Sequence, residues 1–427
     1  MIYEWLCRQS HAISAGSLPV PPYQNQWRET QDERRRQWLE MLGLWPLPER
    51  TPMEPTITGT LERDGYVVEK LHFQAVPGCY TTANLYRPPE VTEPLPCVIY
   101  HCGHGGLGKA TAHYQAQGPY WARHGYVAII LDTIEIGEGQ GDHHGIYRGG
   151  RWDWLSRGYT PSGTETWIGM RALDYLATRE DCDAERVGIT GISGGGAISW
   201  WQGAADERVK IVAPVCQTGS VEMLVADRIL DGHCDCAVWN NWYQFCWPDI
   251  GALICPRPLL VCNGTDDGIW RPYAFRESVH RIKQLYEMLG IGDRCMLLDE
   301  IVPHSYTPTS RKTIMRWFNR HLKGDDTPVT DDITDYQEPE ENLLVFPGER
   351  PPDDMPRVWE VLVPVAQPPE VTDEAAWREH QGQALGRLCS LSLRNIPRER
   401  CPELVHVRTR GGSDTYRATE YEYDGGD

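Results

Sequence analysis

The sequence has no long uninterrupted apolar run and no excess of positive charge. No apolar stretch approaches the roughly 18 residues of a membrane-spanning helix, and the N-terminus, MIYEWLCRQSHAIS, lacks the features of a signal peptide. The 41 Lys and Arg residues are outnumbered by 60 Asp and Glu, giving a net charge of −19. This argues against a nucleic-acid partner, because phosphate binding needs a basic face. We expect a cytoplasmic protein that binds neither membranes nor nucleic acids; its oligomeric state stays open.

Phenylalanine is scarce, and cysteine is scattered rather than dense. Five Phe accompany 17 Trp. Large aromatic side chains are mainly buried, so we expect most of the Trp in the core, although aromatic platforms also suit sugar rings. The 14 cysteines spread over 427 residues, unlike those of a short disulfide-rich secreted domain, and are expected to be free thiols. Apolar residues at 41% and charged residues at 24% are typical of a globular protein.

Short apolar strands alternate with helices through the middle of the chain. Strands are predicted at 66–74, 79–88, 96–103, 126–132, 187–190, 210–216, 258–264 and 295–301. Helices are predicted at 27–44, 114–125, 164–178, from about 197, at 272–289 and at 309–323. This alternation is typical of an α/β fold, with a mostly parallel central sheet and helices on both faces.

Composition divides the chain into three predicted parts. Residues 1–60 are Pro-rich with one helical stretch, residues 61–325 carry the strand and helix pattern, and residues 326–427 begin as an extended, acidic, Pro-rich tail. We expect this tail to wrap the preceding domain or to act as a linker.

Residues 27–73 and 377–423 suggest an internal repeat. They align without gaps at an offset of 350, with identities at Trp27/Trp377, Arg28/Arg378, Glu29/Glu379, Gln31/Gln381, Glu49/Glu399, Arg50/Arg400, Pro52/Pro402, Asp64/Asp414 and Tyr66/Tyr416. Coincidence between two polar helices is the alternative. A real repeat would place the start of a second copy of the central unit at the end of this chain. The chain would then be the N-terminal half of a tandem architecture, or would retain only the entrance of its second copy.

The strongest motif is GISGG at 191–195, between the VGIT strand and a helix. Strand, tight turn and helix are the context of a nucleophile elbow, in which the serine sits in a strained turn and small neighbours let the strand and helix approach. The N-terminus of the helix also favours developing negative charge. The motif predicts Ser193 as a nucleophile, with a merely structural Gly-rich turn as the alternative.

A serine nucleophile needs a histidine base and a carboxylate, which in this arrangement follow in the order Ser, Asp or Glu, His. The seventh predicted strand runs into Asp266 and Asp267. We favour Asp267, because the acid commonly lies three residues after the glycine that ends the strand; Asp266 would then be a loop or cap residue. The eighth predicted strand leads to His304, whereas the later histidines lie inside predicted helices. The predicted triad is Ser193, Asp267 and His304.

An oxyanion hole needs two backbone N–H groups. One is expected from Gly194, directly after the nucleophile, and the other from His104 in the loop of IYHCGHGGLGK, residues 99–109. That loop could instead be read as a phosphate cradle, but it lacks the Walker spacing.

Two further clusters accompany these motifs. The segment GEGQGDHHG, at 137–145, follows a strand at the edge where ligands bind in open α/β sheets, which makes His143 and His144 pocket candidates. The segment His233-Cys234-Asp235-Cys236 carries soft metal ligands, but adjacent residues alone cannot supply the geometry of a metal site. We interpret it as an insertion that lines or covers the acyl pocket, with His233 and Trp270 as substrate-binding candidates, and we expect no metal or organic cofactor.

Three stretches resemble a known family: WIGMRALDYLATREDCDAERVGITGISGGGAISWWQGAADERVK, ICPRPLLVCNGTDDGIW and PHSYTPTSRKTIMRWFNRHLKG. Over about residues 50–325 the chain resembles α/β-hydrolases of the acetyl xylan esterase and cephalosporin-C deacetylase type, close to the dienelactone hydrolase clan. The resemblance implies an α/β-hydrolase fold and a serine carboxylic-ester hydrolase. A dienelactone hydrolase would carry Cys at the elbow, so Ser193 disfavours that chemistry.

The expected substrate is a small-molecule ester. The resemblance implies a small acyl group, such as acetyl, on a carbohydrate or a related small molecule. One alternative is a serine peptidase of the prolyl-oligopeptidase type, although no propeller-like region precedes the catalytic part. The other is a catalytically idle hydrolase fold that acts as an interaction module.

Overall fold

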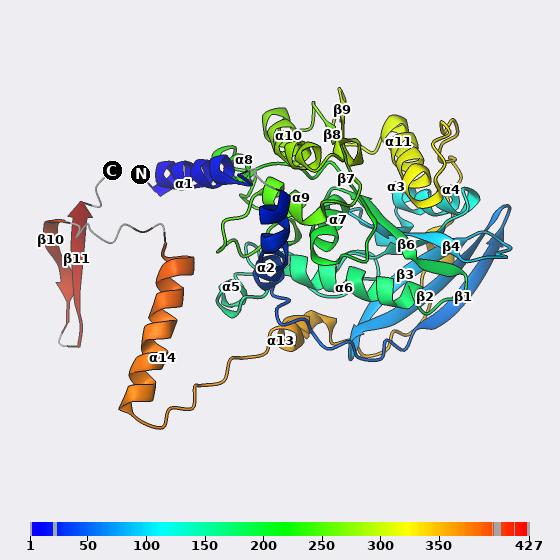
Figure 1. Cartoon of the computed structure of the whole chain (residues 1–427). Helices are drawn as coiled ribbons and strands as arrows, with labels where there is room; N and C mark the ends of the chain where they lie inside the picture. The colour runs from blue at the N-terminus through cyan, green and yellow to red at the C-terminus, as the bar shows by residue number, and fades with distance from the viewer. Residues whose placement is uncertain (1, 20–23, 395, 397–402, 414, 425–427) are drawn as a thin grey trace. The chain divides into compact units, whose positions relative to one another are not determined.

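The computed structural model describes the chain except for residues 1, 20–23, 395, 397–402, 414 and 425–427 (Figure 1). The described residues form two compact units. The larger one comprises residues 10–366, and the smaller one combines residues 1–9 with residues 367–427.

The larger unit is built on a nine-stranded sheet in the order β1-β2-β3-β5-β4-β6-β7-β8-β9. The first three strands form an antiparallel meander, whereas β4 to β9 run parallel to one another. The strands are β1 (Thr56–Arg63), β2 (Tyr66–Val76), β3 (Cys79–Arg87), β4 (Leu95–His101), β5 (Val127–Leu131), β6 (Cys182–Ile192), β7 (Ile211–Val215), β8 (Leu259–Gly264) and β9 (Cys295–Glu300). The mostly parallel sheet confirms the predicted fold class.

Strands β5 and β7, inside the sheet, are apolar throughout. Every residue of β5 and β7 is buried, as expected for parallel strands between two helical layers. The main helices are α2 (Gln24–Leu42), α4 (Gln117–Arg123), α6 (Pro161–Leu176), α7 (Gly194–Ala205), α9 (Trp247–Ile254), α10 (Pro272–Met288) and α11 (Pro308–Phe318). Shorter helices are α3 (Ala112–Gln115), α5 (Trp152–Arg157), α8 (Val221–Ala226), α12 (Glu340–Leu343) and α13 (Val358–Leu362).

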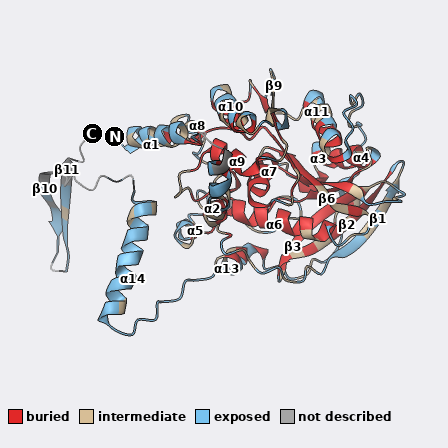
Figure 2. Cartoon of the chain, in the orientation of Figure 1, coloured by how far each residue is buried: buried red, intermediate tan, exposed pale blue. Residues whose placement is uncertain are grey.

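Helix α7 is buried along its whole length. It packs on β6 and β7 and is itself covered by α2, α6 and α9, so all of its residues are buried (Figure 2). Eleven of the 17 Trp side chains are buried, which confirms the expectation that most of them belong to the core: Trp27, Trp38, Trp121, Trp154, Trp167, Trp200, Trp201, Trp239, Trp247, Trp270 and Trp317. Among the described residues, no helix has the length and apolar character needed to cross a bilayer.

Two elements near the N-terminus were not expected. The prediction of a single helix before residue 60 is wrong, because α1 (Ile2–Gly16) precedes α2. Strand β1 was also missed, since it is an edge strand that is mostly exposed and has few apolar residues, so it lacks the apolar run that marks the inner strands.

The acidic stretch after β9 and α11 belongs to the larger unit. Arg63 forms a salt bridge with Glu338, and Arg311 forms one with Asp332, with an Nε–Oδ1 distance of 2.5 Å. Met355 and Val358 are buried in the main core. This stretch therefore contributes packing and ion pairs to the unit that carries the sheet.

The smaller unit contains a helix followed by a two-stranded hairpin. These elements are α14 (Glu374–Arg387), β10 (Glu403–Gly412) and β11 (Arg417–Asp424), and the two strands are antiparallel. They overlap residues 377–423 much as α2, β1 and β2 overlap residues 27–73. Four of the aligned positions, Glu399, Arg400, Pro402 and Asp414, lie outside the described residues. The repeat and the three-part division of the chain stay predictions.

Candidate active site

Ser193 occupies a strained turn between β6 and α7. Its φ of 60° and ψ of −122° lie outside the regions that non-glycine residues normally adopt. The backbone N–H of Ser193 donates to the carbonyl of Val215, at the end of β7, over 3.0 Å. The sharp turn therefore ends one strand, is fixed to the next, and presents the serine at the carboxyl edge of the parallel sheet.

Close approach of β4 requires small residues on both sides of Ser193. A Cβ atom on Gly191 would lie 2.4 Å from the carbonyl oxygen of His101, and one on Gly195 would lie 2.0 Å from the same oxygen. Neither contact is sterically possible. Close packing of the backbone therefore requires glycine at both positions. Helix α7 begins at Gly194, three residues earlier than the predicted start at about residue 197.

Asp267 and His304 meet at the same edge, after β8 and β9. The Oδ2 atom of Asp267 lies 2.7 Å from Nδ1 of His304. The other carboxylate oxygen accepts hydrogen bonds from the backbone N–H groups of Ile269, at 2.8 Å, and Trp270, at 3.3 Å. Asp267 is buried, whereas Asp266 is exposed. The adjacent carboxylates therefore have different environments, and only Asp267 faces the imidazole.

Cys216 is a thiol close to this pair that the sequence did not single out. Its sulfur, an Asp267 oxygen and a His304 nitrogen all lie within 4.8 Å of one another. Burial raises the pKa of the Cys216 thiol to about 12, and the thiol donates to the carbonyl of Ser305 over 3.5 Å. Cys216 is therefore a buried thiol beside Asp267 and His304.

The loop after β4 lies against the elbow. A Cβ atom on Gly103 would come within 3.3 Å of Cβ of Ser193, and one on Gly194 would come within 2.6 Å of Cε1 of His104. Gly194 is the first residue of α7, so its N–H has no acceptor within the helix. The two residues predicted for an oxyanion hole, Gly194 and His104, thus lie beside Ser193 and beside each other.

The loop after β5 brings further histidines to this edge. His143 is buried and His144 is half-buried, and their ring centroids are 4.0 Å apart. Nδ1 of His144 lies 3.1 Å from Oε2 of Glu135, and the same carboxylate oxygen accepts the backbone N–H of His143 at 2.9 Å. Glu135 was missed by sequence reasoning. Its position eight residues before His143 on an irregular loop gives no periodic signal.

The other predicted substrate contacts differ in their accessibility. His233 is half-buried, and its ring centroid lies 6.0 Å from that of Trp270. Burial lowers the pKa of His233, and the nearby imidazoles of His104 and His304 lower it further. Trp270 is fully buried and packs against Trp247. His233 therefore lies close to His304, whereas Trp270 belongs to the core.

Comparison with known proteins places the chain among the α/β-hydrolases. Residues 23–294 match the model of an abhydrolase family. A protein of Bacillus subtilis (strain 168), provisionally named hydrolase YtaP, is 25% identical over 308 residues, which span 68% of this chain and 99% of that protein.

Solved structures share the fold at low sequence identity. Methylesterase BT1017 is 20% identical with a TM-score of 0.59, over 89% of this chain and 80% of that chain. A glucuronoyl esterase from Solibacter usitatus is 16% identical with a TM-score of 0.55, over 69% of this chain and 93% of its own. A protein from Bacteroides fragilis NCTC 9343, provisionally described as an acetyl xylan esterase, is 19% identical with a TM-score of 0.53, over 70% and 82% of the two chains.

Proposed function

The chain belongs to the abhydrolase family, and from that premise we propose that it hydrolyses carboxylic esters through Ser193, His304 and Asp267. The observation that carries this proposal is a strained serine after β6 and a hydrogen-bonded aspartate and histidine after β8 and β9, all following strands of one parallel sheet. A strained elbow and a buried carboxylate on the imidazole are the parts of a serine hydrolase, and neither is needed for the fold alone.

In the proposed reaction, Asp267 orients His304 and stabilises its charged form. Because Nδ1 of His304 is engaged by the carboxylate, Nε2 is the atom that takes the proton from the Ser193 hydroxyl. The serine oxygen attacks the ester carbonyl, and the N–H groups of Gly194 and His104 stabilise the oxyanion. His304 returns the proton to the leaving alcohol, and a water molecule, deprotonated by the same imidazole, then releases the acid from the acyl-enzyme.

The proposed substrate is a small ester of a carbohydrate or a related small molecule. This assignment is supported by the fold neighbours, which are named as a methylesterase, a glucuronoyl esterase and an acetyl xylan esterase. The half-buried His144 and His233 are the candidates to face the substrate, whereas the buried His143 and Trp270 would support them from behind.

A substrate panel tests this proposal. Purified full-length protein and Ser193→Ala would be assayed on p-nitrophenyl acetate, acetylated sugars, methyl esters of uronates and a prolyl peptide. We expect ester turnover by the wild type and a loss of at least about 10⁴-fold in Ser193→Ala, because removing a triad member leaves only binding and the oxyanion hole. Peptide cleavage without ester turnover would favour a peptidase, and inactivity on the whole panel would favour an idle module.

A further inference from the structure

Two cysteines and a histidine, from loops far apart in the sequence, converge beside the elbow. Cys234 and Cys236 are buried, and their sulfur atoms lie 3.1 Å apart. The sulfur of Cys236 is 3.6 Å from Nε2 of His104. One ligand atom from each of the three residues lies within 4.8 Å of the other two. Cys234 and Cys236 alone could not form such a cluster. The loop after β4, which carries His104, supplies the third member.

A fourth donor, His143, is buried beside this cluster with an unused nitrogen. Its ring centroid lies 4.8 Å from that of His104. Nδ1 of His143 is 2.8 Å from the carbonyl of Ile134, to which it donates, while Nε2 is buried without a hydrogen-bond partner. A buried polar atom without a partner is costly. A histidine whose Nδ1–H is held by a carbonyl, leaving the Nε2 lone pair free, has the tautomer that metal sites require.

The loops that carry these donors are tied together by hydrogen bonds. The backbone N–H of Asp235 donates to the carbonyl of His143 over 2.9 Å, and Oδ2 of Asp235 accepts the N–H of Ile146 at 2.8 Å. The carbonyl of Cys236 accepts the indole N–H of Trp201, on α7, at 3.0 Å. The Cys-x-Cys segment is therefore held from both sides, and its sulfur atoms keep a fixed position relative to His143.

We propose that His104, His143, Cys234 and Cys236 form a zinc site. Two thiolates and two imidazoles are a preferred ligand set of Zn²⁺. With Zn–S near 2.3 Å and Zn–N near 2.0–2.1 Å, a tetrahedral ion separates two sulfur ligands by about 3.8 Å and a sulfur from a nitrogen by about 3.6 Å. The Cys236–His104 distance of 3.6 Å matches the second value, and the two sulfur atoms, 3.1 Å apart, would separate by about 0.7 Å on binding the ion. Both cysteines bind as thiolates, so the protons that they carry are released to solvent. Four protein ligands leave no open position, so the ion would be structural rather than catalytic.

The position of His104 gives this site a consequence for the active site. His104 contributes its imidazole to the proposed zinc site and its backbone N–H to the proposed oxyanion hole. Zinc would therefore fix the loop after β4 against Ser193. This consequence rests on the proposed function, whereas zinc binding itself does not.

Metal titration of the full-length protein tests the site. Protein purified under reducing conditions would be stripped with a chelator and titrated with Zn²⁺ against a chromophoric competitor, with native mass spectrometry for stoichiometry. We expect one Zn²⁺ per chain, and with Co²⁺ the visible and charge-transfer absorption of a tetrahedral thiolate complex. Cys234→Ser, Cys236→Ser and His143→Ala should each weaken Zn²⁺ binding by at least about 10-fold. Cys389→Ser and His280→Ala change residues that are not among the proposed ligands, and both variants should bind Zn²⁺ as the wild type does.

Several results would overturn the proposal. Wild-type protein that takes up no Zn²⁺ or Co²⁺ contradicts it, and this measurement does not depend on how well any variant folds. So does binding that survives unchanged in both cysteine variants, or a Cys234–Cys236 disulfide in protein that binds no metal after reduction. Ser193→Ala should bind Zn²⁺ as the wild type does while losing ester turnover, so failure of the zinc site and failure of the proposed esterase are separately visible.

Discussion

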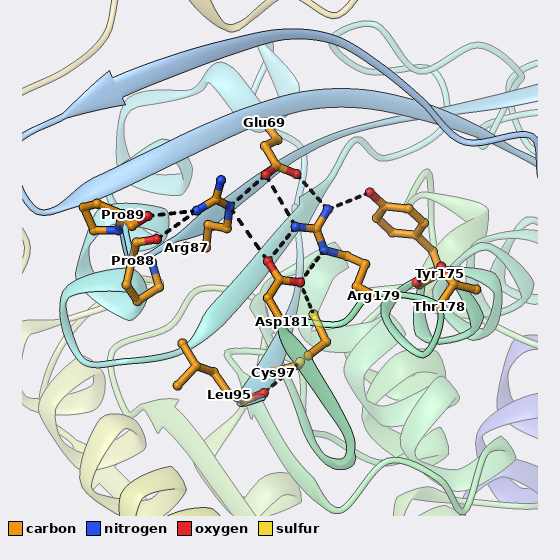
Figure 3. Close-up of polar contacts among 11 residues, drawn as sticks. Glu69, Arg87, Pro88, Pro89, Leu95, Cys97, Tyr175, Thr178, Arg179 and Asp181 are labelled. Atoms are coloured by element: carbon orange, nitrogen blue, oxygen red, sulfur yellow. Dashed lines mark hydrogen bonds and ion pairs between the residues drawn. The ribbon is translucent and has the colours of Figure 1, made fainter. Parts of the chain in front are cut away.

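The amino end of the parallel strands carries a network of arginine–carboxylate pairs, whereas the carboxyl end carries a strained serine and several unsatisfied polar groups. At the amino end, Glu69 accepts from Arg87 at 2.8 Å and from Arg179 at 2.7 Å, and Arg179 also pairs with Asp181 at 2.7 Å (Figure 3). Each carboxylate here has an arginine, and the pairs join β2, β3 and the turn before β6. This end uses charge to connect secondary-structure elements.

At the carboxyl end, some polar groups are buried without a partner, although Lys109 pairs with Asp132 there. Nε2 of His143 and one carboxylate oxygen of Glu165 have no hydrogen-bond partner, and Ser193 is held in a disfavoured conformation. Burial raises the pKa of Glu165 well above its ordinary value. A strained serine and unsatisfied polar groups are thus present where function is proposed, as expected when a site is shaped for chemistry at a cost in stability. The difference predicts that substitutions at the two ends will separate activity from stability.

The largest expected effect comes from Asp267→Asn at the carboxyl end. We expect kcat/KM for the best ester of the panel to fall by about 10³- to 10⁴-fold, because an amide at this position no longer stabilises the charged imidazole and favours the wrong tautomer. Asp266→Asn is the matched control, since Asp266 is exposed and lies next in sequence. It should stay within about threefold of the wild type. Equal losses in the two variants would contradict the assignment of the acid.

Some features of the candidate site could be predicted from the sequence, and others depend on the folded structure. The inner strands, the elbow and the order of the three predicted triad residues follow from apolar runs and from a motif in its context. The preference for Asp267 over Asp266 rests only on its distance from the glycine that ends the strand, because which of them faces inward depends on the turn after β8. The start of α7 was misplaced because three glycines are poor helix formers, whereas the backbone of His101 excludes any side chain at Gly195.

The histidine and cysteine cluster could not be predicted from the sequence either. His104 precedes Cys234 by 130 positions, so no ligand spacing marks them as partners. The sequence shows only that both follow parallel strands. Such segments gather at one edge of the sheet, but the loop conformations that bring Nε2 of His104 to the sulfur of Cys236 are tertiary features.

At the amino end, Glu69→Gln should reduce stability and leave chemistry intact. The side chains of Glu69 and Arg179 are 8% and 14% exposed, so removal of the carboxylate leaves partly buried guanidinium groups short of a counter-charge. We expect a loss of about 2 kcal/mol in the free energy of unfolding by urea, with unchanged kcat/KM per folded molecule. Glu277→Gln, which breaks an exposed pair with Arg281 on α10, should cost about 0.3 kcal/mol. A comparable cost at both positions would refute the structural role of the network.

A buried histidine at the end of β4 should make stability depend on pH. Burial lowers the pKa of His101 to about 4, below its ordinary value of about 6.5. Between these values the unfolded chain binds a proton that the folded chain does not, so stability falls as the pH falls below 6.5. From pH 7.5 to pH 5 this one group should lower the free energy of unfolding by about 2 kcal/mol. His101→Gln should reduce the change in unfolding free energy between pH 7.5 and pH 5 by that amount. An unchanged pH dependence in this variant would exclude His101 as its source. His280→Gln is the control variant.

The smallest expected effect is that of Ser193→Gly, which should raise the free energy of unfolding while abolishing activity. It is the most direct test of strain at the carboxyl end of the sheet. Glycine adopts positive φ without steric cost, so Ser193→Gly should relieve strain of about 1–3 kcal/mol, offset by about 0.5–1 kcal/mol of added chain entropy in the unfolded state. We expect a net gain of about 1 kcal/mol, measured by urea unfolding, and no ester turnover. The same substitution at Ser199, in the interior of α7, removes a hydrogen bond to the carbonyl of Gly195 and should cost about 1–2 kcal/mol. If the two glycine variants lost equal stability, Ser193 would not be a strained residue, and the contrast between the two ends of the sheet would lose its clearest support.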